Sequence, residues 1–431
     1  MAPLGEIEAL PPVIEDRGVL RFITAGSVDD GKSTLIGRLL HDTRTIFEDQ
    51  LAAVARVSRR RGEEDIDLSL LTDGLEAERE QGITIDVAYR YFATPERKFI
   101  IADTPGHEQY TRNMVTAAST ADAALILVDA RKGVLPQTRR HTYIAHLLGV
   151  RHVVVAVNKM DLVGYDEAVF EGIRRDFLAF ASPLAMSDLR FIPISALRGD
   201  LVVERGANMS WYRGPALLSA LEDLEAGDEA DALPLRFPVQ LVVRTGAGTD
   251  FRGYAGRVES GALVRGSEVL ALPSGRRTLV RDILSLDRSL PIAVAGDSVS
   301  VVLADDIDLS RGDLLATPGD APRQAKALEA RICWLSSDPL DVRALAAARF
   351  VLKHTSRSVK ARLTSIRSRF DVGSLTEQAA PAGLIMNDIA DVTVALSQPV
   401  FVDSFRSHRA TGSFILIDEV SNQTVAAGMI A

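Results

Sequence analysis

Residues 26–33 combine glycines, a lysine and a serine in the order that a phosphate-binding loop requires. They fit the pattern G-x-x-x-x-G-K-[ST], with Gly26, Gly31, Lys32 and Ser33 at its fixed positions. Glycines let the backbone wrap around phosphate oxygens with its N–H groups pointing inward, and Lys32 can reach the β and γ phosphates. The Ser33 hydroxyl would bind Mg²⁺. A glycine-rich turn without a nucleotide is the alternative interpretation.

A second segment pairs a carboxylate with a glycine. Residues 103–106 read Asp-Thr-Pro-Gly and begin 71 residues after Lys32 (103 − 32 = 71). A carboxylate on Asp103 could hold Mg²⁺ through water, and the amide of Gly106 could sense the γ phosphate. His107 follows directly.

The third segment, Asn158-Lys159-Met160-Asp161, discriminates best between nucleotide bases. The Asp161 carboxylate can accept hydrogen bonds from N1–H and the exocyclic amine of guanine, whereas adenine has a lone pair at N1 and no amine at C2. Losing such a polar pairing costs roughly 10⁴ or more in discrimination. The predicted base is therefore guanine, and a backbone amide in the fourth segment, Ser195-Ala196-Leu197, would contact its O6.

A threonine between the first two segments completes the predicted site. Thr84 is interpreted as a second hydroxyl ligand of Mg²⁺, ordered by the γ phosphate and released on hydrolysis. The alternative is a threonine in an ordinary strand. The predicted metal ligands are Ser33, Thr84 and Asp103. The predicted nucleotide-binding residues are Gly26, Ser27, Val28, Asp29, Asp30, Gly31, Lys32, Ser33, Thr34, Asp103, Thr104, Pro105, Gly106, His107, Asn158, Lys159, Met160, Asp161, Ser195, Ala196 and Leu197.

Buried strands must position these segments. Five short runs are apolar throughout, as strands covered on both faces are: residues 20–25, 99–102, 124–128, 152–157 and 191–194. A helix with apolar periodicity over residues 35–40 follows the phosphate loop. This alternation predicts an α/β domain with parallel strands.

The rest of the chain has a different pattern. A polar, acidic stretch at 222–234 is interpreted as a linker, and short strands rich in valine and leucine with frequent glycines follow it. We expect a flexible N-terminal arm at 1–18, a nucleotide-binding domain at 19–228, and antiparallel β-barrels at 234–320 and 326–431. The predicted fold is a multidomain protein: an α/β P-loop G domain with a mostly parallel sheet, then two antiparallel β-barrels.

Composition limits the functional classes. The chain has 431 residues, 47% of them hydrophobic, and a net charge of −9, which gives no support to a general polyanion binder. Its only cysteine, Cys333, lies in an apolar context typical of a buried structural thiol. The chain has no secretory signal and no apolar run of the ~18 residues that a spanning helix needs, so we expect a cytoplasmic protein without membrane contact.

Basic residues recur in the predicted second barrel, at Lys353, Arg357, Lys360, Arg362, Arg367 and Arg369. The solvated face of a strand pair is the favoured interpretation. A surface for a partner or for RNA is the alternative.

With these motifs, the chain resembles the translational GTPase superfamily over almost its whole length. The resemblance makes Gly82-Ile83-Thr84-Ile85 and Asp103-Thr104-Pro105-Gly106-His107 the two switch segments. It implies that His107 positions the attacking water, a role that other GTPases give to glutamine. The implied catalytic residues are His107, Lys32 and Thr84, and the implied ligands are GTP, GDP and Mg²⁺.

Elongation factors usually have a histidine where this chain has Asp30. The phosphate loop, residues 80–92, residues 107–114 and the C-terminal residues 411–430 instead resemble the large subunit of bacterial heterodimeric sulfate adenylyltransferase (ATP sulfurylase). That resemblance implies a regulatory GTPase whose hydrolysis drives synthesis of adenosine 5′-phosphosulfate and pyrophosphate from ATP and sulfate on a smaller catalytic partner subunit. It implies a role in sulfate assimilation and cysteine biosynthesis and no nucleic-acid ligand. Without a second phosphate loop, we expect no adenylylsulfate kinase activity.

Two other functions stay open. One is an elongation-factor-like GTPase that binds aminoacyl-tRNA, with the basic strand residues on RNA. The other is a scaffold that binds GTP without hydrolysing it. Asp30 and the C-terminal matches count against the first, and the set of Lys32, Ser33, Thr84, Asp103 and His107 against the second.

Overall fold

The chain folds into two compact units, Met1–Ala226 and Gly227–Ala431. The computed structural model describes residues 18–46, 48–60, 66–71, 87–107, 111–225, 229–244, 251–286 and 288–431. Within these ranges, no helix has both the length and the apolar character needed to cross a membrane. The predicted N-terminal arm lies almost wholly outside them.

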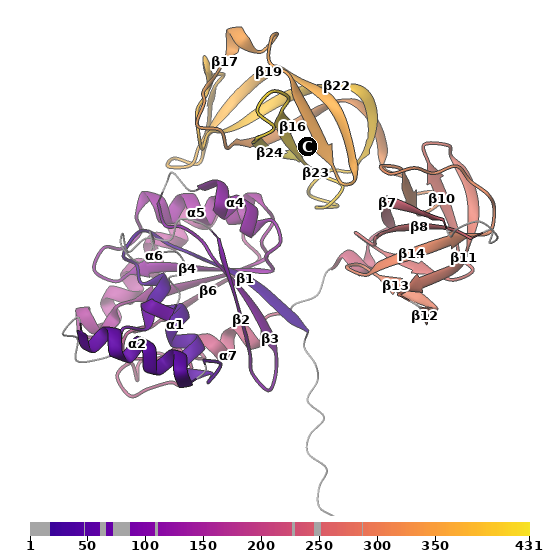
Figure 1. Ribbon diagram of the computed structural model, residues 1–431. Helices are drawn as coiled ribbons and strands as arrows, with labels where there is room; N and C mark the ends of the chain where they lie inside the picture. Colours follow the sequence, from indigo (N-terminus) through magenta and orange to yellow (C-terminus); the bar gives the residue numbers. More distant parts are fainter. Residues whose placement is uncertain are drawn as a thin grey trace, which may run out of the picture. The chain divides into compact units, whose positions relative to one another are not determined.

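The described part of the first unit is organised around a six-stranded sheet of order β2-β3-β1-β4-β5-β6 (Figure 1). Its strands are β1 (Val19–Ala25), β2 (Ala88–Ala93), β3 (Lys98–Asp103), β4 (Ala123–Asp129), β5 (His152–Asn158) and β6 (Asp188–Pro193). All neighbours pair in parallel except β2, which is antiparallel to β3. Every residue of β4 is buried, as expected for a central strand covered on both faces.

Helices pack around this sheet (Figure 1). They are α1 (Lys32–Asp42), α2 (Glu48–Arg60), α4 (Thr111–Ala118), α5 (Pro136–Leu147), α6 (Glu167–Ala181) and α7 (Leu217–Glu222), with the short 3₁₀ turns η1 (Leu68–Leu71), η3 (Met160–Val163) and η4 (Ser182–Leu184). Helix α6 illustrates the sequence logic. The Asp166 carboxylate caps its first turn by accepting from the Ala168 N–H at 2.8 Å, and Phe170, Ile173 and Phe177 are buried along one stripe.

The second unit begins with a short 3₁₀ turn, η5 (Glu229–Ala232), and a first barrel. The barrel strands are β7 (Arg236–Arg244), β8 (Arg252–Arg257), β10 (Glu268–Leu272), β11 (Arg276–Ser285), β14 (Ser298–Leu303) and β15 (Leu314–Ala316), extended by β12 (Arg288–Ser289). Pairing of β10 with β11 closes the sheet. Strands β9 (Ala262–Val264) and β13 (Ile292–Val294) form a separate ribbon.

A second barrel follows in the same unit. Its strands are β16 (Arg323–Trp334), β18 (Phe350–His354), β19 (Arg357–Asp371), β22 (Ile389–Val402), β23 (Ser413–Asp418) and β24 (Thr424–Ile430), extended by β20 (Thr376–Ala379) and accompanied by β17 (Leu340–Asp341), η6 (Val342–Ala344) and β21 (Gly383–Leu384). Pairing of β18 with β19 closes it. Along β19, Val359 and Leu363 are buried while Lys360 and Arg362 are exposed, the alternation of a strand with one face in a core.

The predicted fold class is confirmed: a G domain with a mostly parallel sheet precedes two closed antiparallel barrels. The predicted domain limits stay predictions. Cys333 is buried on β16, as its apolar context indicated.

The basic residues of the second barrel lie on β18 and β19, and four of them are in ion pairs. The pairs are Arg357–Asp313 at 3.5 Å, Lys360–Glu419 at 3.1 Å, Arg367–Glu329 at 2.9 Å and Arg369–Asp388 at 3.8 Å. This arrangement favours the solvated strand face over an RNA surface, because neighbouring carboxylates offset much of the positive charge.

A buried arginine joins the two barrels. Arg236 on β7 is 1% exposed, and its Nε and Nη2 donate to the two carboxylate oxygens of Asp403, which follows β22, at 2.8 and 2.9 Å. Its Nη1 also donates to the Asp320 carbonyl at 2.9 Å. The planar guanidinium fork matches a carboxylate in this bidentate geometry, so the joint is specific as well as charged.

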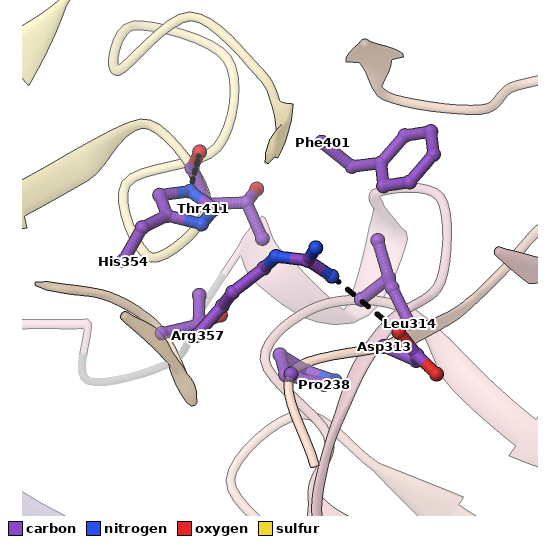
Figure 2. Close-up of a pocket in the computed structure, with 9 residues that line it drawn as sticks. Pro238, Asp313, Leu314, His354, Arg357, Phe401 and Thr411 are labelled. Atoms are coloured by element: carbon purple, nitrogen blue, oxygen red, sulfur yellow. Dashed lines mark hydrogen bonds and ion pairs between the residues drawn. The ribbon is translucent and has the colours of Figure 1, made fainter. Parts of the chain in front are cut away.

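A small pocket lies beside this joint (Figure 2). The Arg357 side chain points across it toward Asp313, and the His354 ring bonds the Thr411 carbonyl at 2.8 Å. The pocket has room for about one water molecule at most. We therefore read it as part of the packing between the barrels.

Candidate nucleotide-binding site

The phosphate loop connects β1 to α1 as the sequence predicted. Gly31, just before the helix, has φ of 92°, in the left-handed region that favours glycine. A Cβ on Gly31 would lie 2.5 Å from Asn158 Nδ2, so close packing also requires a glycine here. The phosphate loop and the segment Asn158–Asp161 are therefore in direct contact.

Lys32 folds back over the loop. Its ammonium donates to the carbonyls of Gly26 at 2.9 Å and Ser27 at 3.0 Å, and the residue is only 7% exposed. Burial lowers the pKa of Lys32, while the nearby carboxylates of Asp103 and Asp30 act in the opposite direction. The geometry places a cation directly over the loop backbone, where phosphate oxygens would bind.

Asp30 is a buried carboxyl in the same loop. It is 1% exposed, and its Oδ2 accepts from the Ser27 N–H at 2.6 Å. Burial raises the pKa of Asp30 to about 6, against the opposing influence of Lys32 and of the Ser27 hydrogen bond. Asp30 thus stabilises the turn of the phosphate loop through its hydrogen bond with Ser27.

The Asp103–Gly106 segment meets the phosphate loop. Thr24 on β1 is in register with Asp103 on β3, and its hydroxyl donates to Asp103 Oδ1 at 2.9 Å. A Cβ on Gly106 would lie 2.6 Å from Lys32 Nζ and 2.8 Å from the Gly26 carbonyl. The first two motifs therefore converge on one point.

The remaining switch residues are described only in part. His107 is exposed and follows Gly106 directly, at the end of the described segment. Thr84 lies outside the described residues, and so does the whole of the first predicted switch segment. The assignments of both residues stay predictions.

The guanine end of the site is organised by Asn158. Its Nδ2 donates to the Asp30 carbonyl at 2.8 Å, and its Oδ1 accepts from the Ala196 N–H at 3.0 Å. The Ser195 hydroxyl donates to Asp161 Oδ1 at 2.7 Å. One amide side chain thus ties the phosphate loop to the turn at Ser195–Leu197, while that turn orients the carboxylate predicted to read the base.

Asp129 is a residue of this site that lies outside the four predicted segments. This buried residue ends β4, and its carboxylate is 2.6 Å from Arg131 Nη2 and 3.1 Å from Lys159 Nζ. Burial alone would raise the pKa of Asp129, but the hydrogen bonds from Arg131 and Lys159 outweigh it and lower that pKa. Lys159 also donates to the Asp29 carbonyl, so Asp129 holds the lysine against the phosphate loop. In the sequence, Asp129 could have been recognised as a carboxylate at the end of an otherwise apolar strand.

Known proteins match this chain over both units. Residues 17–227 match the family model "Elongation factor Tu GTP binding domain", and residues 327–431 match "GTP-eEF1A C-terminal domain-like". "Sulfate adenylyltransferase subunit 1" of Laribacter hongkongensis is 52% identical over 419 residues, which cover 96% of this chain and 86% of that protein. The chain belongs to the sulfate adenylyltransferase subunit 1 family.

Other relatives agree with membership of the sulfate adenylyltransferase subunit 1 family. The protein of that name from Shewanella oneidensis is 52% identical over 96% of this chain and 86% of its own length. "Bifunctional enzyme NodQ" of Rhizobium meliloti is 50% identical over 99% of this chain, which spans 66% of that protein. A solved structure of the bacterial selenocysteine-specific elongation factor EF-Sec matches with a TM-score of 0.44 at 21% identity, covering 95% of this chain and 58% of that one. That similarity is too low to add to the assignment.

Membership of this family and the GTP-binding domain assign guanine nucleotide binding to the first unit. The described residues bring three of the four predicted segments into direct contact around Asn158, and the fourth, Asp103–Gly106, reaches them through Lys32.

Proposed function

We propose that this chain is the regulatory GTPase subunit of a sulfate adenylyltransferase. GTP hydrolysis here would drive the formation of adenosine 5′-phosphosulfate and pyrophosphate from ATP and sulfate on a partner subunit. The convergence of Lys32, Gly106 and Asn158 on the phosphate loop carries the proposal, because it supplies phosphate and base recognition in a single site. The proposed reaction is that of a sulfate adenylyltransferase, because the relatives carry the name "Sulfate adenylyltransferase subunit 1".

The chemistry follows from the side chains. Lys32 and the loop amides would bind the β and γ phosphates and stabilise negative charge as the terminal phosphoryl group leaves. His107 would position the attacking water, and Asp161, oriented by Ser195, would accept from the guanine N1–H and amine. A carboxylate, an alcohol and phosphate oxygens suit Mg²⁺, which Asp103 and Ser33 would help to hold. When bound, Mg²⁺ would neutralise phosphate charge.

The partner we propose is the smaller catalytic subunit, which would bind ATP and sulfate. Energy transfer requires that a surface of this chain differ between its GTP and GDP states and that this difference bias the partner. The predicted switch segments around Thr84 and His107 are the candidates. Since its function consumes GTP and ATP, we propose a cytoplasmic location.

One reconstitution tests this function. The chain is purified with and without the candidate smaller subunit, and GTP hydrolysis and sulfate-dependent pyrophosphate release are followed together. We expect GTP hydrolysis to accelerate when the partner, ATP and sulfate are all present, because the switch is then coupled to adenylyl transfer.

Binding of charged tRNA is measured in parallel. Hydrolysis that ignores the partner, ATP and sulfate, together with tight binding of aminoacyl-tRNA, would replace this proposal with the elongation-factor alternative.

A further inference from the structure

The Arg38 side chain extends from α1 to the turn Ser195–Leu197, the predicted guanine-binding turn. It lies six residues after Lys32 (38 − 32 = 6), on the helix that begins at the phosphate loop. Its Nε donates to the Ala196 carbonyl at 3.1 Å and its Nη2 to the Leu197 carbonyl at 2.5 Å. One rigid guanidinium therefore holds two successive peptides of the predicted guanine-binding turn.

The side chain of Arg38 is itself held in place. Its Nη1 lies 3.5 Å from Asp42 Oδ1, one helical turn further along α1, and the side chain is only 19% exposed. Gly199 is a near neighbour, since a Cβ added to it would lie 3.7 Å from the Arg38 Cδ. Because the ion pair with Asp42 and its low exposure restrict the guanidinium, it can orient the turn rather than follow it.

The N–H groups that follow the two carbonyls lie on the side of the turn opposite Arg38. In a trans peptide the C=O and N–H bonds point in opposite directions, so carbonyls directed at Arg38 turn the following N–H groups away from α1. The Arg198 N–H donates to Ser195 Oγ at 3.2 Å, and Ser195 Oγ donates to Asp161 at 2.7 Å. The peptide whose carbonyl Arg38 holds is thus linked to the predicted base-reading carboxylate.

We propose that Arg38 is a positioning residue for guanine specificity. By fixing the carbonyls of Ala196 and Leu197 from α1, it aims the N–H of Leu197, which belongs to the same peptide as the Ala196 carbonyl, at the O6 of the base. The inference rests on guanine nucleotide binding at this site. It assigns to the phosphate-loop helix a second task beyond phosphate binding, which is to set the geometry of base recognition.

Binding measurements on the full chain test this role. Dissociation constants are measured by calorimetry for GDP and for 6-thioguanosine 5′-diphosphate, which keeps N1–H and the amine but lacks O6, having a weakly accepting sulfur in its place. Arg38→Met removes both donors at similar length. We expect it to weaken GDP binding about threefold to tenfold, the value of one hydrogen bond, and to leave the O6-lacking nucleotide unchanged. Arg38→Lys, which can serve only one carbonyl well, should restore part of the loss.

The control is Arg174→Met. Arg174 forms an exposed ion pair with Glu171 at 3.1 Å on α6, so its loss should change neither dissociation constant. Equal weakening of both nucleotides by Arg38→Met, or no weakening of either, would overturn the proposal. If thermal unfolding shows that Arg38→Met is not folded, Arg38→Lys decides alone: a selective loss of GDP affinity supports the role and an unchanged affinity overturns it. Wild-type protein that binds ADP as tightly as GDP would instead remove guanine recognition, the premise.

Discussion

Replacing Asp161 with asparagine should reverse the base preference of this chain from guanine to xanthine. The Ser195 hydroxyl donates to the Asp161 carboxylate at 2.7 Å. The role proposed for this carboxylate is to accept from N1–H and the exocyclic amine of guanine. An asparagine amide loses one acceptor but can donate to the carbonyl that xanthine has at C2. Mismatched polar groups of this kind shift discrimination by roughly 10⁴, so GTP should lose its advantage over xanthosine triphosphate.

Competition between GDP and xanthosine diphosphate measures this preference. Asp176→Asn is the matched control, because Asp176 is exposed on α6 and the same change of charge there should leave base preference as it is. An Asp161→Asn protein that still selects guanine would remove Asp161 from base recognition.

Replacing His107 with alanine should abolish most GTP hydrolysis while sparing GTP binding. His107 follows Gly106, whose Cα lies so close to Lys32 that a Cβ would come within 2.6 Å of Nζ, so the histidine begins beside the predicted phosphate site. Positioning of the attacking water by a histidine is expected to contribute roughly 10²–10⁴-fold to the rate. Affinity for GTP should change little, because phosphate and base contacts come from other residues.

Single-turnover hydrolysis and nucleotide titration separate these two effects. His146→Ala on α5 serves as the control, since His146 lies outside the proposed site and should alter neither quantity. A parallel loss of rate and affinity would mean that His107 binds GTP rather than positions water.

The described parts of the site were predictable where function depends on local sequence. Gly31, Lys32 and Asn158 belong to contiguous segments whose residue types have direct chemical reasons, and the structure brings these segments together. The continuous apolar runs identified β1, β3, β4, β5 and the end of β6. The signal is clearest for β4 and β5, where nearly every residue on both faces is buried.

Contacts between distant segments were not predictable in this way. Strand β2 was not predicted, because it lacks a continuous apolar run. It lies at the edge of the sheet, and its side chains Tyr89 and Tyr91 are exposed there. Arg38 and Asp129 act through partners set by tertiary packing, and each is an ordinary charged residue in its own segment. The same holds for Arg236, whose partner Asp403 is 167 residues away.

The final level of adenosine 5′-phosphosulfate, measured once its net synthesis has stopped, tests the coupling most directly. The chain and its smaller partner subunit are mixed with ATP and sulfate, and product is quantified with GTP or with a non-hydrolysable GTP analogue. If hydrolysis drives the unfavourable transfer, product should accumulate beyond the uncoupled equilibrium with GTP only, and the His107→Ala protein should behave with GTP as the wild type does with the analogue. Equal accumulation with GTP and with the analogue would contradict the account.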